Sequence, residues 1–206
     1  PLGSLADLRP AFARTQADGT FLDVKDVVDL RLNVSTLRAV TSYLRARDEE
    51  RFPALIKMTE SVELFPDIER EIDRIINKYG EVKDTASPQL AEIRRSILSA
   101  QSSISKTLNA ILRQAQASGI VDKEAAPTIR EGRLVIPVAA MNKRKIQGII
   151  HDESATGKTA FVEPTAVVEV NNRLRELENE ERREVIRILV EFTNSVRPYY
   201  DAIAQS

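Results

Sequence analysis

Residues 130–172 read REGRLVIPVAAMNKRKIQGIIHDESATGKTAFVEPTAVVEVNN, a short stretch with strand-like alternation and glycine punctuation. It lies between two long helix-like segments of similar length, residues 88–118 and 165–197. This order predicts a small β module at the tip of a two-helix arm. Such an arrangement fits a protein that reaches out and holds something large better than it fits a compact enzyme pocket.

The β module is predicted to contain three strands, since β-forming residues cluster and alternate in three places. The predicted strands cover residues 133–140, 145–151 and 159–162, with turns at 141–144 and 152–158. Three short strands can form a small meander, although so few strands are marginally stable alone. Pro137 cannot donate to a ladder, which favours an edge position for the first of them.

Both long segments carry apolar residues at seven-residue spacing, which is typical of a coiled-coil seam. In the first segment the repeat is Leu90, Ile97, Ile104 and Ile111, with a mild break at Thr107. In the second it is Val167, Leu174 and Ile188, with Val170 and Leu177 on the partner positions. This seam is interrupted at Glu181 and Glu184 and resumes one step shifted at Val185, Leu189, Phe192 and Val196. A lone amphipathic helix of this length would leave its stripe in water, so we predict antiparallel packing of the two helices.

Helix signals mark the ends of these segments and the region before them. Ser87 followed by Pro88 predicts the start of the first long helix, and Gly119 its end. Residues 5–65 predict several short helices, with Asp23 and Ser35 as N-caps. Residues 67–79 predict an amphipathic helix closed by Gly80. Residues 1–4 read as the remnant of a cleaved affinity tag.

Composition supports a mainly α fold with a small β module. Hydrophobic residues make up 42% of the 206 and charged residues 30%, so a core is possible, and 5% aromatics with few glycines favours long helices. The net charge is −1, so any basic footprint must be local. The absence of Cys excludes thiolate metal sites and disulfides. No apolar run is long enough to span a membrane, and we expect a cytoplasmic protein.

No set of residues forms a convincing catalytic site. His151 is the single histidine, and we expect it to be a surface or turn hydrogen-bonding residue. The acids of residues 176–184 alternate with arginines, which is typical of a solvated helix. The run Gly157-Lys158-Thr159 resembles the end of a phosphate-binding loop, but Asp152 stands where that loop needs glycine and a strand follows where it needs a helix. We therefore expect a β-turn there, without nucleotide binding.

One local cluster of positive charge stands out in the β module. Lys143, Arg144 and Lys145 are consecutive in one turn, and the same module contains Arg130, Arg133 and Lys158. A solvated hairpin turn is the commoner meaning of three adjacent basic residues. The alternative is a tip that contacts phosphates, and its place at the end of an arm favours that reading.

The residues of the β module and the helix after it resemble a known family. The pattern is Arg130-x-Gly132-Arg133-Leu134-Val135-Ile136-Pro137-Val138, then Gly148-Ile149-Ile150-His151-Asp152-x-Ser154-x-x-Gly157-x-Thr159-x-Phe161-x-Glu163-Pro164, then Asn171-Asn172-x-Leu174-x-Glu176-Leu177. It resembles the clamp and lever region of the MutS family. It is most similar to the type-II branch, whose members lack the mismatch-reading N-terminal domain and usually carry a C-terminal Smr nuclease domain.

The resemblance implies a layout of core, levers and clamp. Following the tag remnant at 1–4, the expected parts are a partial helical core at 5–85, a first lever helix at 86–119, a β-rich clamp at 120–164 and a second lever helix at 165–206 that returns to the core. In this family the clamps of a dimer close around duplex DNA through backbone contacts. Type-II members are linked to DNA repair, branched DNA and suppression of recombination, and some bacterial ones to collided ribosomes.

The resemblance also implies what this chain does without. It is expected to stop before the family's ATPase, so ATP and Mg would bind in the missing ATPase domain, and we expect no cofactor and no catalysis here. The full-length relative would be an ATPase and possibly an endonuclease and a homodimer. Position 158 departs from the family pattern, since Lys158 adds charge to a turn where a small or polar residue is expected.

Together these observations predict sequence-independent engagement of duplex or branched DNA. The expected contacts are chiefly Lys143, Arg144 and Lys145, with Arg130, Arg133 and Lys158 as secondary candidates. Two other functions stay open. The arm could dock on protein, such as a ribosome or a second MutS subunit, or it could be a mechanical strut without nucleic-acid contact.

Overall fold

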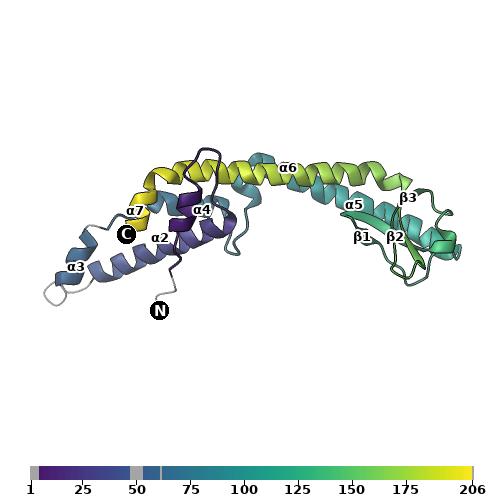
Figure 1. Ribbon diagram of the computed structural model, residues 1–206, viewed down its shortest axis with the longest axis horizontal. Helices are drawn as coiled ribbons and strands as arrows, with labels where there is room; N and C mark the ends of the chain where they lie inside the picture. The colour runs from purple at the N-terminus through teal and green to yellow at the C-terminus, as the bar shows by residue number, and fades with distance from the viewer. Residues whose placement is uncertain (1–4, 47–52, 61, 206) are drawn as a thin grey trace. The chain divides into compact units, whose positions relative to one another are not determined.

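The computed structural model describes residues 5–46, 53–60 and 62–205 (Figure 1). The predicted tag remnant at 1–4 lies outside them. The chain divides into two compact units, one formed by residues 1–91 with 183–206 and the other by residues 92–182. We call these the helical unit and the clamp unit. The mainly α fold with a small β module is confirmed.

Helices account for most of the helical unit. They are α1 (Arg9–Arg14), α2 (Val24–Arg45), α3 (Pro53–Glu60), α4 (Pro66–Ile75), α7 (Tyr200–Gln205) and the C-terminal part of α6, with short 3-10 turns η1 (Asp84–Ala86) and η3 (Arg197–Tyr199). Asp23 caps α2 as predicted, because its side chain accepts from the Asp26 amide while the Asp26 carboxylate accepts from the Asp23 amide. The prediction of Ser35 as an N-cap is wrong. Ser35 lies inside α2, and its hydroxyl donates to the Leu32 carbonyl at 3.1 Å.

Helix α4 ends earlier than predicted. It stops at Ile75, and Ile76 forms an antiparallel bridge with Val82. This bridge buries Ile76 and Val82 to 1% and 6% exposure, whereas Tyr79, which a longer helix would include, is 76% exposed. Gly80 has φ +80° and supports the turn between the bridged residues.

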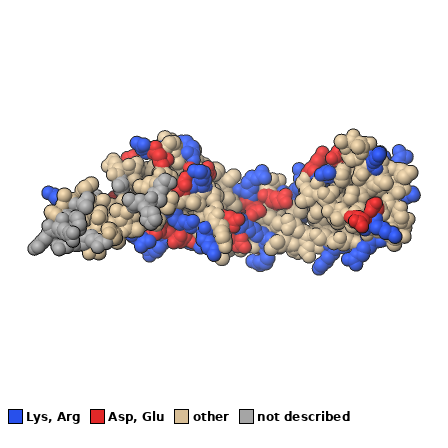
Figure 2. Space-filling view, turned by 90° about the horizontal axis from the view of Figure 1, so that it is seen from below, with Lys and Arg blue, Asp and Glu red and all other residues tan. Residues whose placement is uncertain are grey.

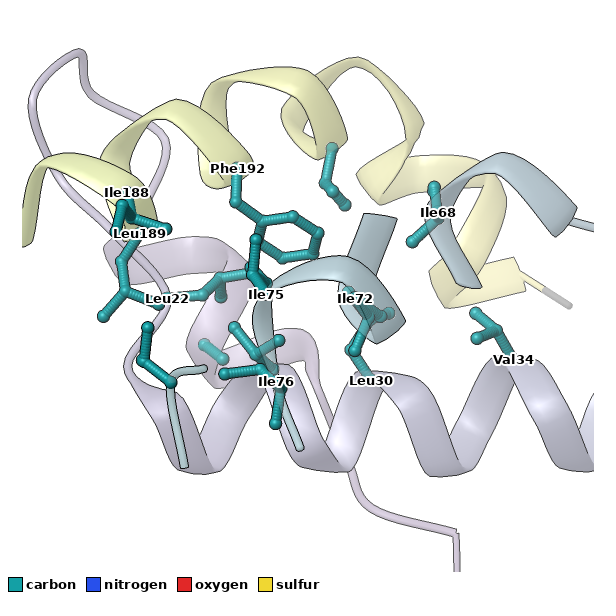
Figure 3. Packing of buried hydrophobic residues seen from close by; sticks show 14 of the residues in the cluster. Leu22, Leu30, Val34, Ile68, Ile72, Ile75, Ile76, Ile188, Leu189 and Phe192 are labelled. Atoms are coloured by element: carbon teal, nitrogen blue, oxygen red, sulfur yellow. The ribbon is translucent and has the colours of Figure 1, made fainter. Parts of the chain in front are cut away.

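The core of the helical unit collects apolar side chains from segments far apart in sequence. In Figure 3, side chains of α2, α4 and the C-terminal part of α6 point toward one another. They include Leu30, Ile72, Ile75, Leu189 and Phe192, all at most 3% exposed. The last turns of α6 therefore belong to this core, since Phe192 and Val196 are buried in it.

The clamp unit contains the C-terminal part of α5 (Pro88–Ala117) and the N-terminal part of α6 (Thr165–Val196). These two helix segments run antiparallel, as predicted (Figure 1). Near one end of this pair Arg94 donates to Glu181 at 2.7 Å. The seam buries Ile93, Ile97, Ile104 and Leu108 from α5 against Val167, Leu174 and Leu177 from α6. The described residues include no helix long and apolar enough to cross a membrane.

The predicted breaks in the seam have structural counterparts. At Thr107 the buried stripe of α5 moves one position, so Leu108 is fully buried and Thr107 half-buried. In the helical unit, the hydroxyl of Ser87 accepts from the Leu90 amide at 3.0 Å, which confirms Ser87 as the N-cap of α5. The same hydroxyl donates to the buried Glu184 carboxylate at 2.6 Å. The polar interruption at Glu184 is thus paired within the core.

Four strands form one antiparallel sheet, β1 (Thr128–Arg130), β2 (Arg133–Ala139), β3 (Gly148–Glu153) and β4 (Thr159–Pro164). Their order is β1-β2-β4-β3, so the last strand lies between β2 and β3. The predicted meander order is therefore wrong. The burial of the strands gives the reason, because β4 is buried along almost its whole length, whereas β3 is mostly exposed and takes an edge.

The sequence did not predict strand β1, which has three residues and pairs only with the start of β2. The two strands are joined by Glu131 and Gly132, with φ +49° and +73°, as expected for a tight two-residue hairpin. Beyond Val135 strand β2 pairs with β4 alone, so Pro137 has a neighbouring strand on one side only. Its predicted edge position is correct locally.

Candidate nucleic-acid interface

The structure separates the six predicted basic residues into two groups at opposite ends of strand β2. Arg130 and Arg133 are paired at the start of β2, whereas Ala139 at its end is paired with Thr159, next to Lys158. Strand rise puts the two ends roughly 20 Å apart. They cannot form one compact patch.

Arg133 is mostly buried, and its guanidinium is bound to side chains within the clamp unit. Its guanidinium donates to the Glu163 carboxylate at 2.8 Å and to the Asn172 side chain at 2.7 Å. The Arg133 side chain is 15% exposed and that of Glu163 is not exposed at all. Arg133 thus serves the interior of the clamp unit.

Arg130 covers an aromatic ring. Its guanidinium carbon lies 4.1 Å from the centroid of Phe161, and its Nε lies 3.7 Å from an oxygen of Asp152. Phe161 is 7% exposed, so the guanidinium shields the ring from water. Part of its charge is already balanced by Asp152.

The other group lies where two turns meet. The Lys143 amide donates to Ala140 at 3.3 Å and the Lys145 amide to Asn142 at 2.8 Å, which folds residues 140–145 into a compact turn. The Ala140 amide donates to the Lys158 carbonyl at 2.9 Å and so ties this turn to the one at 154–158. We call Lys143, Arg144, Lys145 and Lys158 the basic end.

The four cations of the basic end differ in whether they already have an acidic partner. The ammonium of Lys143 donates to Glu153 at 2.7 Å. Arg144, Lys145 and Lys158 are exposed, and within the described residues no carboxylate forms an ion pair with them. Lys and Arg side chains gather along the outer rim of the strand-bearing unit in Figure 2 (right). Exposed and unpaired cations are those that can meet an outside anion without losing an internal partner.

The turn at Gly157-Lys158-Thr159 is closed by its own hydrogen bonds. The Gly157 amide donates to the Ser154 carbonyl at 2.7 Å, and the Thr159 amide to the Ser154 hydroxyl at 3.1 Å. Strand β4 starts at Thr159. Phosphate-binding loops instead direct free amides and a helix N-terminus at the ligand. The turn matches the expected β-turn.

A buried polar network joins the strands of the clamp to α6. The Glu163 carboxylate contacts Nε2 of His151 at 2.5 Å and accepts from the Asn171 amide at 2.7 Å, in addition to Arg133. Burial acts to raise the pKa of Glu163, but the hydrogen bonds from His151, Asn171 and Arg133 outweigh it and hold that pKa below its usual value. The network keeps the carboxylate charged in the interior.

The prediction that His151 is a surface residue is wrong, because its side chain is 13% exposed and contacts a fully buried carboxylate. A signal was present in the sequence. Arg133, His151, Glu163, Asn171 and Asn172 all belong to the pattern that carried the family resemblance, and the structure brings them into contact. That pattern therefore contains the residues of an internal polar network.

The charged stretch of α6 behaves as predicted for a solvated helix around Arg173, but the prediction is wrong for Glu184, whose side chain is buried. Arg173 donates to both Glu176 and Glu180 at 3.1 Å, and these side chains are at least 36% exposed. In the part of the chain that the structure describes, no group of three His, Asp or Glu side chains is placed to hold a metal ion.

Comparison with known proteins gives one consistent result. No family model matches the chain. It is 39% identical over 203 residues to Endonuclease MutS2 of Symbiobacterium thermophilum, covering 98% of this chain and 25% of that protein. The proteins of the same name from Geobacillus sp. (strain WCH70) and Pelotomaculum thermopropionicum are 35% and 37% identical, covering 100% and 99% of this chain and 26% of each relative.

The chain belongs to the MutS family of proteins. Within that family its relatives are the MutS2 proteins of the type-II branch, and the resemblance predicted from residues 130–172 is confirmed over nearly the whole chain. The chain spans about a quarter of the length of these curated relatives.

Proposed function

We propose that this part of a type-II MutS protein engages the sugar–phosphate backbone of duplex or branched DNA through the basic end. The carrying observation is that Arg144, Lys145 and Lys158 are exposed, lie on two turns joined by a hydrogen bond, and have no carboxylate partner among the described residues. Lys143 adds a cation that can exchange Glu153 for a phosphate. Arg130 and Arg133 are not included among the proposed DNA contacts, because Arg130 lies over the Phe161 ring and Arg133 is paired with Glu163.

The proposed engagement does not depend on base sequence. Long, turn-borne Lys and Arg side chains reach phosphates, and phosphate contacts carry no base information. The basic end consists of two short connections, residues 140–147 and 154–158, and neither supplies a long helix that could lie in a major groove. We expect weak binding by this chain alone, about micromolar or weaker at physiological salt.

The wider proposal concerns the full-length protein. Its relatives are named endonucleases. We propose that ATP and Mg bind, and that nucleotide and DNA strand chemistry occur, in parts of the protein beyond this segment, and that the whole protein acts as a homodimer. In that assembly the clamp unit holds DNA without catalysis of its own, in DNA repair and suppression of recombination.

The test compares duplex DNA binding across a salt series for three versions of the chain. They are the parent, the triple variant Arg144→Gln, Lys145→Gln, Lys158→Gln, and a control with the same charge change, Arg173→Gln, Arg175→Gln, Arg182→Gln on α6. Each lost phosphate contact should lower the slope of log affinity against log salt by about 0.9. We expect a fall of about 2–3 for the first variant and little change for the control. Equal slopes for all three would refute a DNA contact at the basic end.

A second candidate function has one specific observation in its favour. Met141 is 89% exposed and belongs to the same turn as Lys143 and Arg144. An exposed thioether suits an adaptable protein contact, such as a ribosomal surface or a MutS subunit. Binding to isolated ribosomes that Met141→Ser abolishes, and that added salt weakens little, would favour this function. Binding to neither ligand would favour a mechanical strut.

A further inference from the structure

Helix α5 contains a long run without acids. Residues 93–121 include Arg94, Arg95, Lys106 and Arg113 but no Asp or Glu, although charged residues make up 30% of the chain. Arg94 is engaged with Glu181 across the helix pair. Arg95, Lys106 and Arg113 are exposed instead.

Those three cations lie on one stripe of the helix. Steps of four and three residues along α5 lead through Arg95, Ser99, Ser102, Lys106, Asn109 and Arg113, and every one of these residues is exposed. Steps of this size keep side chains on one face of an α-helix. We call this set the α5 stripe. It differs from the buried seam, which contains Ile97, Ile104 and Leu108.

Every side chain of the α5 stripe can donate a hydrogen bond, and its three charges are all positive. In the part of the chain that the structure describes, no carboxylate forms an ion pair with Arg95, Lys106 or Arg113. A solvated helix face normally mixes both signs of charge, because pairs at three- and four-residue spacing stabilise it. The α5 stripe forgoes this stabilisation.

Helix α6, the partner of α5 in the clamp unit, shows the usual mixture. Its residues 165–182 contain Glu169, Glu176, Glu178, Glu180 and Glu181 together with Arg173, Arg175 and Arg182. Both helices are solvated and of similar length, so a general requirement for solubility does not explain the difference. The excess of positive charge is confined to the α5 side of the pair.

We infer that the α5 stripe is a second contact surface for the phosphate backbone of a duplex nucleic acid. The stripe extends for roughly 27 Å at the helical rise of 1.5 Å per residue. A duplex presents one negative charge per about 1.7 Å of its axis, so a straight row of donors of this length faces many phosphates. Ser and Asn side chains are regular phosphate ligands beside Arg and Lys.

This inference rests on the proposed function, since it adds a second surface to the same ligand. The two surfaces approach each other at the C-terminal end of α5. There Lys145 of the basic end lines a cavity of about 350 Å³ together with Gln114 and Ser118, which lie on a different face of α5 from Arg113. The Asn142 side chain also donates to the Ile120 carbonyl at 3.0 Å, which fixes the basic turn against the end of the helix.

An acidic protein surface fits the α5 stripe less well. Protein interfaces are enriched in aromatic and other large apolar anchors at their centre. The stripe itself contains none, and Leu98 beside it, 66% exposed, is a single large apolar side chain. Charge complementarity together with hydroxyl and amide donors favours phosphates as the occupant.

The test is a salt series with duplex DNA on Arg95→Gln, Lys106→Gln, Arg113→Gln in the whole 206-residue chain. The control is again Arg173→Gln, Arg175→Gln, Arg182→Gln, which removes the same charge from the partner helix. We expect the slope of log affinity against log salt to fall by about 2–3 for the α5 variant, and the affinity to fall about tenfold or more at low salt. The control should keep most of the parent slope, and both variants should keep the parent's melting temperature because all six residues are exposed.

The outcomes separate this inference from the proposed function. If affinity and salt slope fall for the basic-end variant but not for the α5 variant, the α5 surface is refuted and the proposed function is still supported. A loss for the α5 variant alone supports the stripe and refutes the basic end. Displacement of the duplex from the stripe by polyglutamate at equal charge concentration overturns the nucleic-acid assignment.

A second measurement does not depend on affinity. The chain has no cysteine, so Ser102→Cys and Glu178→Cys each introduce a single thiol, on α5 and α6 respectively. Saturating duplex DNA should slow alkylation of the thiol on α5 at least about fivefold and leave that on α6 unchanged, since buried or covered thiols react slowly. An alkylation rate of the α5 thiol that saturating DNA leaves unchanged would overturn the inference.

Discussion

Nε2 of His151 lies 2.5 Å from Oε2 of Glu163, and this contact joins the edge strand β3 to the interior of the clamp unit. The Glu163 side chain is fully buried, and Arg133 of β2 and Asn171 of α6 complete its surroundings. A single carboxylate therefore links three strands of the sheet to the helix that follows them. The exposed edge strand buries little apolar surface itself, and this polar contact adds to its backbone pairing with β4.

The stability of the clamp unit should depend on pH through Glu163. Its pKa is lower in the folded chain than in the unfolded chain, because hydrogen bonds favour the carboxylate more than burial disfavours it. Such a group stabilises the fold above its ordinary pKa of about 4.3, and that stabilisation disappears as the pH falls toward the folded value. We expect a lower free energy of unfolding at about pH 4 than at pH 7 in urea titrations followed by circular dichroism.

The variant Glu163→Gln is the control for this pH dependence. It removes the titrating group and leaves Arg133 without its counter-charge, so the expected loss at pH 7 is about 3–5 kcal/mol. The difference in stability between pH 7 and pH 4 should also be smaller than in the parent. An unchanged difference would show that other carboxyls, such as Glu71 and Glu184 with their lowered pKa values, account for all of it.

The helix seam should not tolerate a charge at its centre. Ile104 is fully buried in the cluster formed by α5 and α6. Ile104→Asp buries an unpaired carboxyl and should cost at least about 3 kcal/mol. Leu98→Asp is the matched control in the same helix, because Leu98 is 66% exposed, and it should change stability by about 0.5 kcal/mol or less. Similar melting temperatures for the two variants would contradict a packed seam at Ile104.

Gly148 is required by a close approach of two strands. A Cβ at this position would lie 2.1 Å from the Glu163 carbonyl oxygen and 2.9 Å from Cα of Pro164. Because these are backbone atoms, Gly148→Ala must displace β4 and should cost about 1–3 kcal/mol or more. Gly157→Ala has open space and should cost only about 1–2 kcal/mol, from its positive φ of +67°. A smaller loss for Gly148→Ala than for Gly157→Ala in thermal unfolding would refute this reason.

ATP should not bind at the Gly157-Lys158-Thr159 turn. The Gly157 and Thr159 amides are already bonded within the turn, and a strand follows it. Titration of the chain with Mg-ATP in a calorimeter is expected to give no saturable heat, and Lys158→Ala should leave that result unchanged. Saturable binding that Lys158→Ala abolishes would show that the turn is a nucleotide site.

The two long helices could be predicted because the signals for each helix lie within its own stretch of sequence. A seven-residue apolar repeat, the Ser87-Pro88 start and the Gly119 stop are all local signals. The antiparallel pairing followed from the need to cover two apolar stripes of similar length. The phosphate-loop resemblance could be rejected from Asp152 and the β-forming residues that follow Thr159.

The errors occurred where the outcome depended on contacts between distant residues. His151 has no sequence neighbour that reveals its partner, because Glu163 is twelve residues away and becomes adjacent only when β4 inserts between β2 and β3. Ser35 has the chemistry of an N-cap, but packing of α2 along its length continues the helix through it. Helix α4 ended early because Ile76 gained a bridge to Val82.

The sequence by itself determined the class of the fold, the long helices, the position of the β module and the family, because periodicity, capping residues and a dense motif are readable along the chain. Only the tertiary structure decided the strand order and the separation of Arg130 and Arg133 from Lys143, Arg144, Lys145 and Lys158. The physical reason is that strand pairing and ion pairing are selected by burial across the whole unit. The residue type Lys or Arg does not reveal whether the side chain contacts water, an aromatic ring or a buried carboxylate.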